Sequence, residues 1–199
     1  MTEPTAATGP AAADALARFR AAIVAYGGRV VEVPDLAAVA AYAAERARTR
    51  RPAPRVVVER GARDEAAWRA HADVAQTILS TPPEAAEAAA ARQAIIDSDV
   101  CVGLVDWAIA ETGQAVLYRS GEWGRLLAYL APIYVGVVRA DRFVPTLADF
   151  LDGLGAATVA ATPAITFVSG CSVSADIENI ITPGVHGPLE LHLLVLPST

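Results

Sequence analysis

Segments with the apolar spacing of helices alternate with short β-branched runs along this chain. The first helix face comprises four apolar residues spaced three, four and three positions apart, namely Leu16, Phe19, Ile23 and Tyr26. Gly27-Gly28 ends this helix, and residues 29–33 read as a strand. Pro34-Asp35 then opens a second helix, and a second strand covers residues 56–59. Helices and strands that alternate at this spacing indicate an α/β domain with parallel strands.

The alternation continues to the end of the chain. Trp68 anchors a helical segment within residues 60–80, and further helices are predicted at 81–97, 122–130 and from Pro145 to about Gly155. Strands are predicted at 100–105, 115–118, 133–139, 165–168 and 191–196, and the last two complete the same sheet. No fixed repeat or flexible linker divides the chain, so residues 12–199 are predicted to form one domain after a disordered lead-in, residues 1–11.

The apolar composition does not indicate a membrane protein. Hydrophobic residues make up 54% of the chain and the mean hydropathy is +0.36, but alanine inflates both values. The apolar run 126–138 is interrupted by Pro132 and is too short to span a bilayer. No basic segment followed by a hydrophobic stretch opens the chain, so no signal peptide is predicted. We therefore expect a cytoplasmic protein.

The charged residues and cysteines exclude several kinds of chemistry. All 16 basic residues are arginine, which excludes a Schiff-base lysine and a phosphate-loop lysine. The net charge of −6 argues against nucleic-acid binding. Cys101 and Cys171 are too few for a disulfide framework and too far apart for a metal site. An iron–sulfur cluster needs about four thiolates, so we expect no metal or cofactor held by this chain alone.

Two polar loops near the C-terminus predict a ligand site. The first follows the strand 165–168, and Ser174 is predicted to cap a short helix with Asp176 and Glu178 in its first turn. Backbone amides at such a helix start bind anions. The second is a glycine loop around His186, before the strand 191–196. Polar loops between buried strands form ligand crevices in α/β proteins. The loop residues predicted to bind the ligand are Ser169, Gly170, Ser172, Ser174, Asp176, Glu178 and Gly187.

His186 is the best general acid/base in these loops, because the imidazole pKa suits proton transfer and the glycines beside it admit a ligand. For Ser172 and Ser174 the alternative is plain helix capping. A Ser172/His186/Asp176 triad is disfavoured, since the second glycine of Gly-x-Ser-x-Gly is missing. No Gly-x-Gly-x-x-Gly dinucleotide fingerprint occurs.

A third segment, Glu111-Thr112-Gly113, lies between two apolar runs. From local sequence it is a hairpin turn in which Gly113 supplies a positive φ and Glu111 is solvated.

Three blocks together resemble the LUD domain family, in its lactate utilization protein C branch. The first block is Ala108-Ile-Ala-Glu111-Thr112-Gly113 with the segment up to residue 135, and the second is Val144-Pro145-Thr-Leu-Ala-Asp149. The third runs from Ser169 through Glu178 and from Gly184 through His192. The chain departs from the family pattern at Cys171 and Val173, where a cation is missing, and this should weaken anion binding.

The resemblance implies a fold and a role. The fold is a single-domain, Rossmann-like layered sheet of the NagB/ribose-phosphate-isomerase/CoA-transferase-like type. The role is participation in oxidation of L-lactate to pyruvate with iron–sulfur partner subunits, to which this chain contributes a small-anion pocket or a docking surface. Glu111 and His186 become the candidate catalytic residues, and Thr112 and Gly113 join the ligand-binding set. Two alternatives stay open: a free-standing enzyme acting on a small carboxylate, CoA ester or sugar phosphate, and a non-catalytic assembly subunit.

Overall fold

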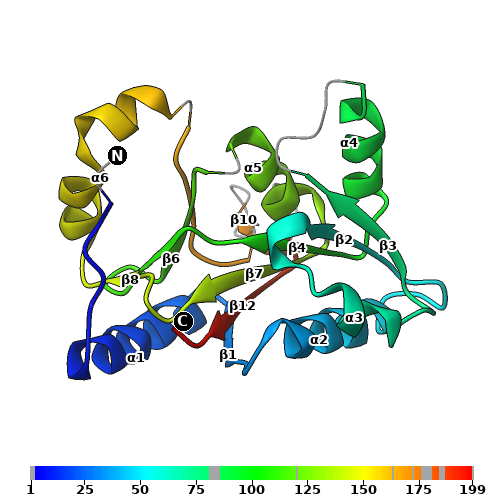
Figure 1. Ribbon diagram of the computed structural model, residues 1–199, viewed down its shortest axis with the longest axis horizontal. Helices are drawn as coiled ribbons and strands as arrows, with labels where there is room; N and C mark the ends of the chain where they lie inside the picture. The colour runs from blue at the N-terminus through cyan, green and yellow to red at the C-terminus, as the bar shows by residue number, and fades with distance from the viewer. Residues whose placement is uncertain are drawn as a thin grey trace.

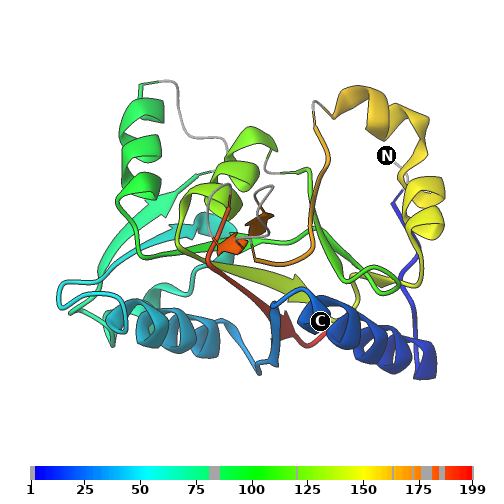
Figure 2. The same cartoon turned by 180° about the vertical axis from the view of Figure 1, so that it is seen from behind.

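A wholly parallel, six-stranded sheet forms the centre of the protein (Figures 1 and 2). The computed structural model describes residues 3–80, 86–119, 121–162, 164–171, 173–175, 181–183 and 187–198. Along the sheet the strands are β1 (Arg29–Glu32), β12 (Glu190–Leu196), β7 (Ile133–Arg139), β4 (Val100–Leu104), β2 (Arg55–Glu59) and β3 (Ala75–Leu79). All five neighbouring pairs are parallel, so crossovers must join them. The predicted α/β class is confirmed.

Helices cover both faces of this sheet. On one face lie α1 (Pro10–Ala25), α4 (Ala88–Ile96) and α5 (Gly121–Leu130), and on the other α2 (Leu36–Arg48) and α3 (Glu65–Arg69). Residues of β4 alternate between the two cores: Cys101 faces the first, and Val100 and Val102 face the second. A strand buried on both faces carries an uninterrupted apolar run, which is why β4 and β7 were recognisable from sequence.

A smaller, four-stranded sheet is built from two of the crossovers. Its order is β8 (Phe143–Val144), β5 (Trp107–Ile109), β6 (Gln114–Leu117) and β9 (Thr166–Val168). The connection from β4 to β7 supplies β5 and β6, and the connection from β7 to β12 supplies β8, α6 (Leu147–Ala161) and β9. The prediction that residues 165–168 join the main sheet is therefore wrong, because β9 pairs with β6 instead.

Several predicted ends are right because local capping sets them. The Asp35 side chain accepts a hydrogen bond from the amide of Ala38 at the start of α2. Thr146 and Asp149 form a capping box at the start of α6. The predicted end near Gly155 is right for the first helical segment of α6, because the backbone of Gly155 is non-helical with φ 69° and ψ 148°. A second helical segment, which sequence analysis missed, follows this kink and ends at Ala161.

The structure differs from the sequence prediction in two segments, residues 60–80 and 173–183. The structure has a 3-10 turn, η1 (Arg60–Ala62), then α3 with Trp68 buried, and also β3, which sequence analysis missed. Sequence analysis predicts that a short helix starts at Ser174, and this start is wrong. Ser174 lies in β10 (Val173–Ala175), which pairs antiparallel with β11 (Ile181–Pro183). The predicted cap at residues 81–84 lies outside the described residues.

The segment before α1 contacts the small sheet. The amide of Ala7 donates a hydrogen bond to the carbonyl of Phe143 at 2.9 Å, and Glu3 makes ion pairs with Arg119 and Arg142. These contacts belong to the segment for which the sequence predicts a disordered lead-in.

None of the helices in the described ranges is long and apolar enough to cross a membrane.

Candidate functional site

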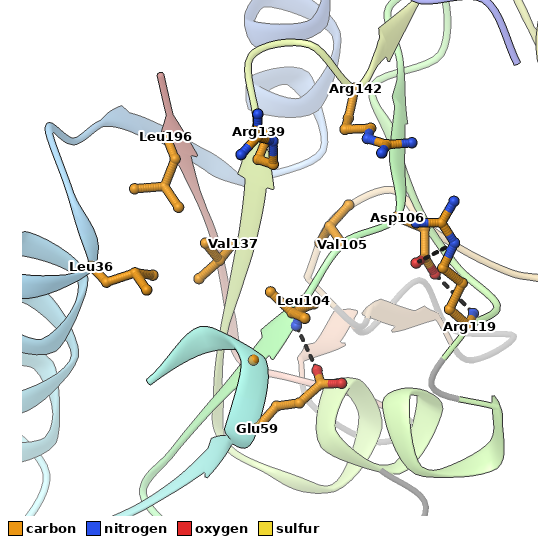
Figure 3. A pocket seen from close by; sticks show the side chains of 11 residues that line it. Leu36, Glu59, Leu104, Val105, Asp106, Arg119, Val137, Arg139, Arg142 and Leu196 are labelled. Carbon is orange, nitrogen blue, oxygen red and sulfur yellow. Dashed lines mark hydrogen bonds and ion pairs between the residues drawn. The ribbon is translucent and has the colours of Figure 1, made fainter. Parts of the chain in front are cut away.

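A crevice opens at the carboxyl ends of the parallel strands, where the chain leaves the main sheet for the small one (Figure 3). Its volume is about 450 Å³. The lining comes from the ends of β2, β4, β7 and β12, from the start of α2 and from connecting segments: Leu36, Glu59, Gly61, Leu104, Val105, Asp106, Arg119, Val137, Arg139, Arg142 and Leu196. Ligands of open α/β sheets bind at this edge. We call it the carboxyl-edge crevice.

Two carboxylates line the crevice, Glu59 near the bottom of Figure 3 and Asp106 at its right. Glu59, the last residue of β2, is 3% exposed and accepts a hydrogen bond from the amide of Leu104 at 2.6 Å. Asp106 follows β4, and its side chain accepts hydrogen bonds from the backbone amides of Tyr118 at 2.7 Å and Arg119 at 3.0 Å. Burial raises the pKa of Asp106 above its ordinary value, although these backbone hydrogen bonds oppose the rise. A carboxyl group with a raised pKa in a cleft is typical of functional sites.

Three arginines complete the polar lining. Arg119 Nε lies 3.7 Å from Asp106 Oδ1. Arg139, at the end of β7, forms a two-pronged ion pair with Asp141, with both N–O distances 3.0 Å. The Arg142 guanidinium lies over the ring of Trp107, 4.9 Å from its centroid. A guanidinium has five N–H donors in a planar fork, which suits it to the oxygens of a carboxylate or phosphate.

The arrangement suits a small ligand that carries an oxyanion and a hydroxyl group. Guanidinium groups bind carboxylates and phosphates through paired hydrogen bonds. The carboxylates Glu59 and Asp106 accept hydrogen bonds when ionised. The apolar side chains of Leu36, Val137 and Leu196 form the opposite wall (Figure 3). A 2-hydroxy acid has the required pair of polar groups on a small apolar frame.

Sequence analysis missed every charged residue of this crevice. A signal was present, because Glu59, Asp106 and Arg139 each stand at the carboxyl end of a correctly predicted strand. Parallel strands bring these ends to one edge of the sheet. Arg119 and Arg142 carried no such signal, since each lies on a connection whose path depends on the small sheet.

The structure brings three of the predicted site residues together in a second cavity. Glu111, Thr112 and Ser169 line it with Ala22, Ala25, Tyr26 and Gln114, and its volume is about 460 Å³. We call it the Glu111 cavity. Tyr26 is 60% exposed because α1 ends at Ala25, so it does not pack inward as its spacing predicted. Among the described lining residues the only charged side chain is the Glu111 carboxylate, which does not favour an anion there.

Two of the three predicted ligand-binding glycines, Gly113 and Gly170, lie close to α1 or its C-cap. Gly113 has φ 65° in the β5–β6 hairpin, as predicted, and a Cβ there would lie 2.5 Å from the amide nitrogen of Ile23. A Cβ on Gly170 would lie 2.3 Å from the carbonyl oxygen of Tyr26. Close packing therefore requires glycine at both positions, and no ligand is needed to account for either residue.

The remaining predicted residues are not gathered into a described site. Ser174 lies in β10, so the helix start that was to bind an anion through its amides is absent at residues 173–175. Gly187 is partly buried before β12. Ser172, Asp176, Glu178 and His186 lie outside the described residues. Within the described part of the chain, no group of three or more His, Cys, Asp or Glu side chains is placed to hold a metal ion.

The fold and the carboxyl-edge crevice define an α/β protein with a candidate small-ligand site. A model of the LUD domain family matches residues 16–196. The chain therefore belongs to the LUD domain family. It also resembles a solved structure of a DUF162 family protein from Deinococcus radiodurans, with a TM-score of 0.63, 24% identity, and coverage of 94% of this chain and 99% of the other. That likeness establishes a shared fold.

Curated relatives match over a shorter segment. Lactate utilization protein C from Deinococcus radiodurans is 34% identical over 90 residues, which cover 45% of this chain and 42% of that protein. The protein of the same name from Bacillus subtilis is 34% identical over 85 residues, covering 41% of this chain and 35% of the relative. The matched segments thus span less than half the length of these relatives.

Proposed function

We propose that this LUD domain protein acts in lactate utilization by binding a small carboxylate, L-lactate or pyruvate, in the carboxyl-edge crevice. One observation carries the proposal: three arginine guanidiniums and two buried or nearly buried carboxylates converge where β2, β4 and β7 end. The guanidiniums would hold the carboxylate of the ligand, and Asp106 or Glu59 would accept a hydrogen bond from the 2-hydroxyl group of L-lactate.

The names of the relatives support the lactate assignment. Lactate utilization protein C is the name of the matched proteins from Deinococcus radiodurans and Bacillus subtilis. We further propose that oxidation of L-lactate to pyruvate involves iron–sulfur partner subunits, because two cysteines are too few to ligate a cluster in this chain. In this proposal the chain supplies substrate binding, and electrons pass to the partners.

The test is ligand-induced stabilisation of the purified protein. L-lactate, pyruvate, glycolate, CoA and a sugar phosphate are compared by thermal unfolding. A ligand at 100 times its dissociation constant adds about 2.7 kcal/mol to the free energy of unfolding. We expect the 2-hydroxy and 2-oxo acids to stabilise the wild type and to lose this effect in Arg139→Leu.

Arg48→Leu is the matched control. Arg48 makes the same kind of two-pronged ion pair, with Asp73 at 2.8 Å for both contacts, and it does not line the crevice. Stabilisation by CoA or a sugar phosphate alone would instead favour a free-standing enzyme. Stabilisation by none of them, together with normal lactate oxidation by a reconstituted complex containing Arg139→Leu, would favour an assembly subunit.

A further inference from the structure

Glu3 joins two of the crevice arginines. One of its carboxylate oxygens, Oε1, accepts a hydrogen bond from Arg119 Nη2, and the other, Oε2, accepts one from Arg142 Nη1 at 2.6 Å. Both arginines line the carboxyl-edge crevice, whereas Glu3 does not. The two guanidiniums are therefore spaced to hold one carboxylate between them, with one oxygen for each.

The chain reaches this position from far away in sequence. Glu3 is 116 residues from Arg119 and 139 residues from Arg142. The connecting segment is fixed to the small sheet through the hydrogen bond from Ala7 to Phe143. The hydrogen bond from Arg142, above all other interactions, lowers the pKa of Glu3, so its carboxylate stays ionised at more acidic pH than that of an ordinary glutamate.

The contact is of a kind that a free carboxylate can replace. The side chain of Glu3 is 45% exposed, and those of Arg119 and Arg142 are 42% and 27% exposed. Ion pairs between such exposed groups contribute little to stability. The Arg142 guanidinium is held independently of Glu3, because it lies over the Trp107 ring.

We infer that Arg119 and Arg142 form a carboxylate-binding subsite at the edge of the crevice, and that Glu3 occupies this subsite in the ligand-free protein as an internal competitor. The inference rests on the proposed function in one respect, that the ligand of the crevice is a carboxylate. Beyond the proposed function, the inference assigns the binding of the ligand carboxylate to Arg119 and Arg142, and it requires the ligand to displace Glu3. The occupant class is a small monocarboxylate, and acetate is its simplest probe.

The test is a titration with acetate at constant ionic strength, comparing the wild type with Glu3→Gln. Trp107 is the reporter, because its ring lies under Arg142. Labelling with 5-fluorotryptophan gives one ¹⁹F signal for each of the three tryptophans, and Trp68→Phe and Trp123→Phe assign Trp107 by elimination. The apparent affinity for acetate equals the intrinsic affinity multiplied by the fraction of protein in which Glu3 has left the two arginines. Releasing two exposed ion pairs should thus tighten acetate binding roughly two- to thirtyfold.

Glu65→Gln is the matched control. Glu65 also makes ion pairs with two arginines, Arg63 at 3.3 Å and Arg69 at 3.1 Å, and it does not line the crevice. This variant should bind acetate like the wild type, and Arg142→Met should abolish the saturable shift of the Trp107 signal. Equal acetate affinity in the wild type and Glu3→Gln, or no saturable shift in Glu3→Gln, would overturn the inference.

The same titrations separate this inference from the proposed function. Tighter acetate binding by Glu3→Gln, with L-lactate and pyruvate binding no better than acetate, would support the subsite and contradict the role in lactate utilization. Binding of L-lactate that depends on Arg139 but is unchanged in Glu3→Gln would support that role and contradict the subsite.

Discussion

The Glu111 carboxylate accepts a hydrogen bond from the backbone amide of Leu147 at 3.3 Å. Leu147 is the first residue of α6, and the first amides of a helix have no partner within it. Negative charge at this end of a helix is also favourable. Glu111 therefore links the β5–β6 hairpin to α6, in addition to lining the Glu111 cavity. Its predicted catalytic role stays a prediction.

Glu111→Gln should lower the free energy of unfolding by about 0.3–1 kcal/mol, because the amide keeps a hydrogen-bond acceptor and loses the charge. Urea denaturation at low ionic strength measures this change, and added salt should reduce it. Unchanged stability together with lost turnover would show that Glu111 acts on a ligand instead.

Gly113→Ala should destabilise the protein more than Gly9→Ala. Both glycines have positive φ, 65° and 56°, but a Cβ on Gly9 meets nothing within 4 Å, whereas one on Gly113 overlaps the backbone at Ile23. The conformational cost of each is about 1–3 kcal/mol, and overlap adds roughly another 1–3 kcal/mol for Gly113. Urea unfolding compares the two variants, and equal losses would contradict the close approach of the hairpin to α1.

Asp106→Asn should gain stability relative to the wild type as pH rises from 4 to 7. Burial places the pKa of Asp106 above 3.8 in the folded protein, so folding favours the protonated form. The contribution of Asp106 to the free energy of unfolding of the wild type therefore falls as pH rises through the raised pKa. The variant has no such fall, because asparagine does not titrate. Urea unfolding at several pH values gives the difference between the two proteins.

Asp73→Asn serves as the control for this pH dependence. The hydrogen bonds from Arg48 lower the pKa of Asp73 to about 2, so the wild type gains stability at Asp73 as pH rises from 2 toward 3.8. The free energy of unfolding of the variant minus that of the wild type should then fall as pH rises, chiefly below pH 5. The same sign for both variants would contradict the assignment of Asp106.

The two cysteines should differ in reactivity. Burial raises the pKa of Cys101 to about 12, so almost no thiolate forms at pH 8. Cys171 is partly exposed, and its thiol donates to the carbonyl of Gly27 at 3.3 Å. Iodoacetamide should modify Cys171 in the native protein and both residues after denaturation. Mass spectrometry of the peptides gives the rates, and equal native rates would refute a buried Cys101.

The elements predicted correctly are those whose signals are local. Asp35 caps α2 within three residues, and the apolar runs of β4 and β7 follow from burial on both faces. The errors concern pairing between distant segments. Residues 166–168 form a strand as expected, but only contact with β6 decides which sheet they join. Likewise, β10 depends on pairing with β11, and this outweighs the capping pattern at Ser174.

The candidate site was harder to predict for the same reason. Glu111, Thr112 and Ser169 were expected together and do share a cavity. The residues of the carboxyl-edge crevice come from separate connections, and Arg119 and Arg142 meet only because two crossovers contribute to one small sheet. Periodicity and capping carry no information about that meeting.

The pairing of β1 with β12 has a consequence for biosynthesis. It aligns Arg29 with His192 and Glu32 with Val195, so β1 is synthesised well before the strand with which it pairs. Contacts so distant in sequence form slowly. Until β12 leaves the ribosome, β1 and β7 each lack a neighbour, and their exposed edges are the points at which a nascent chain would need protection from aggregation.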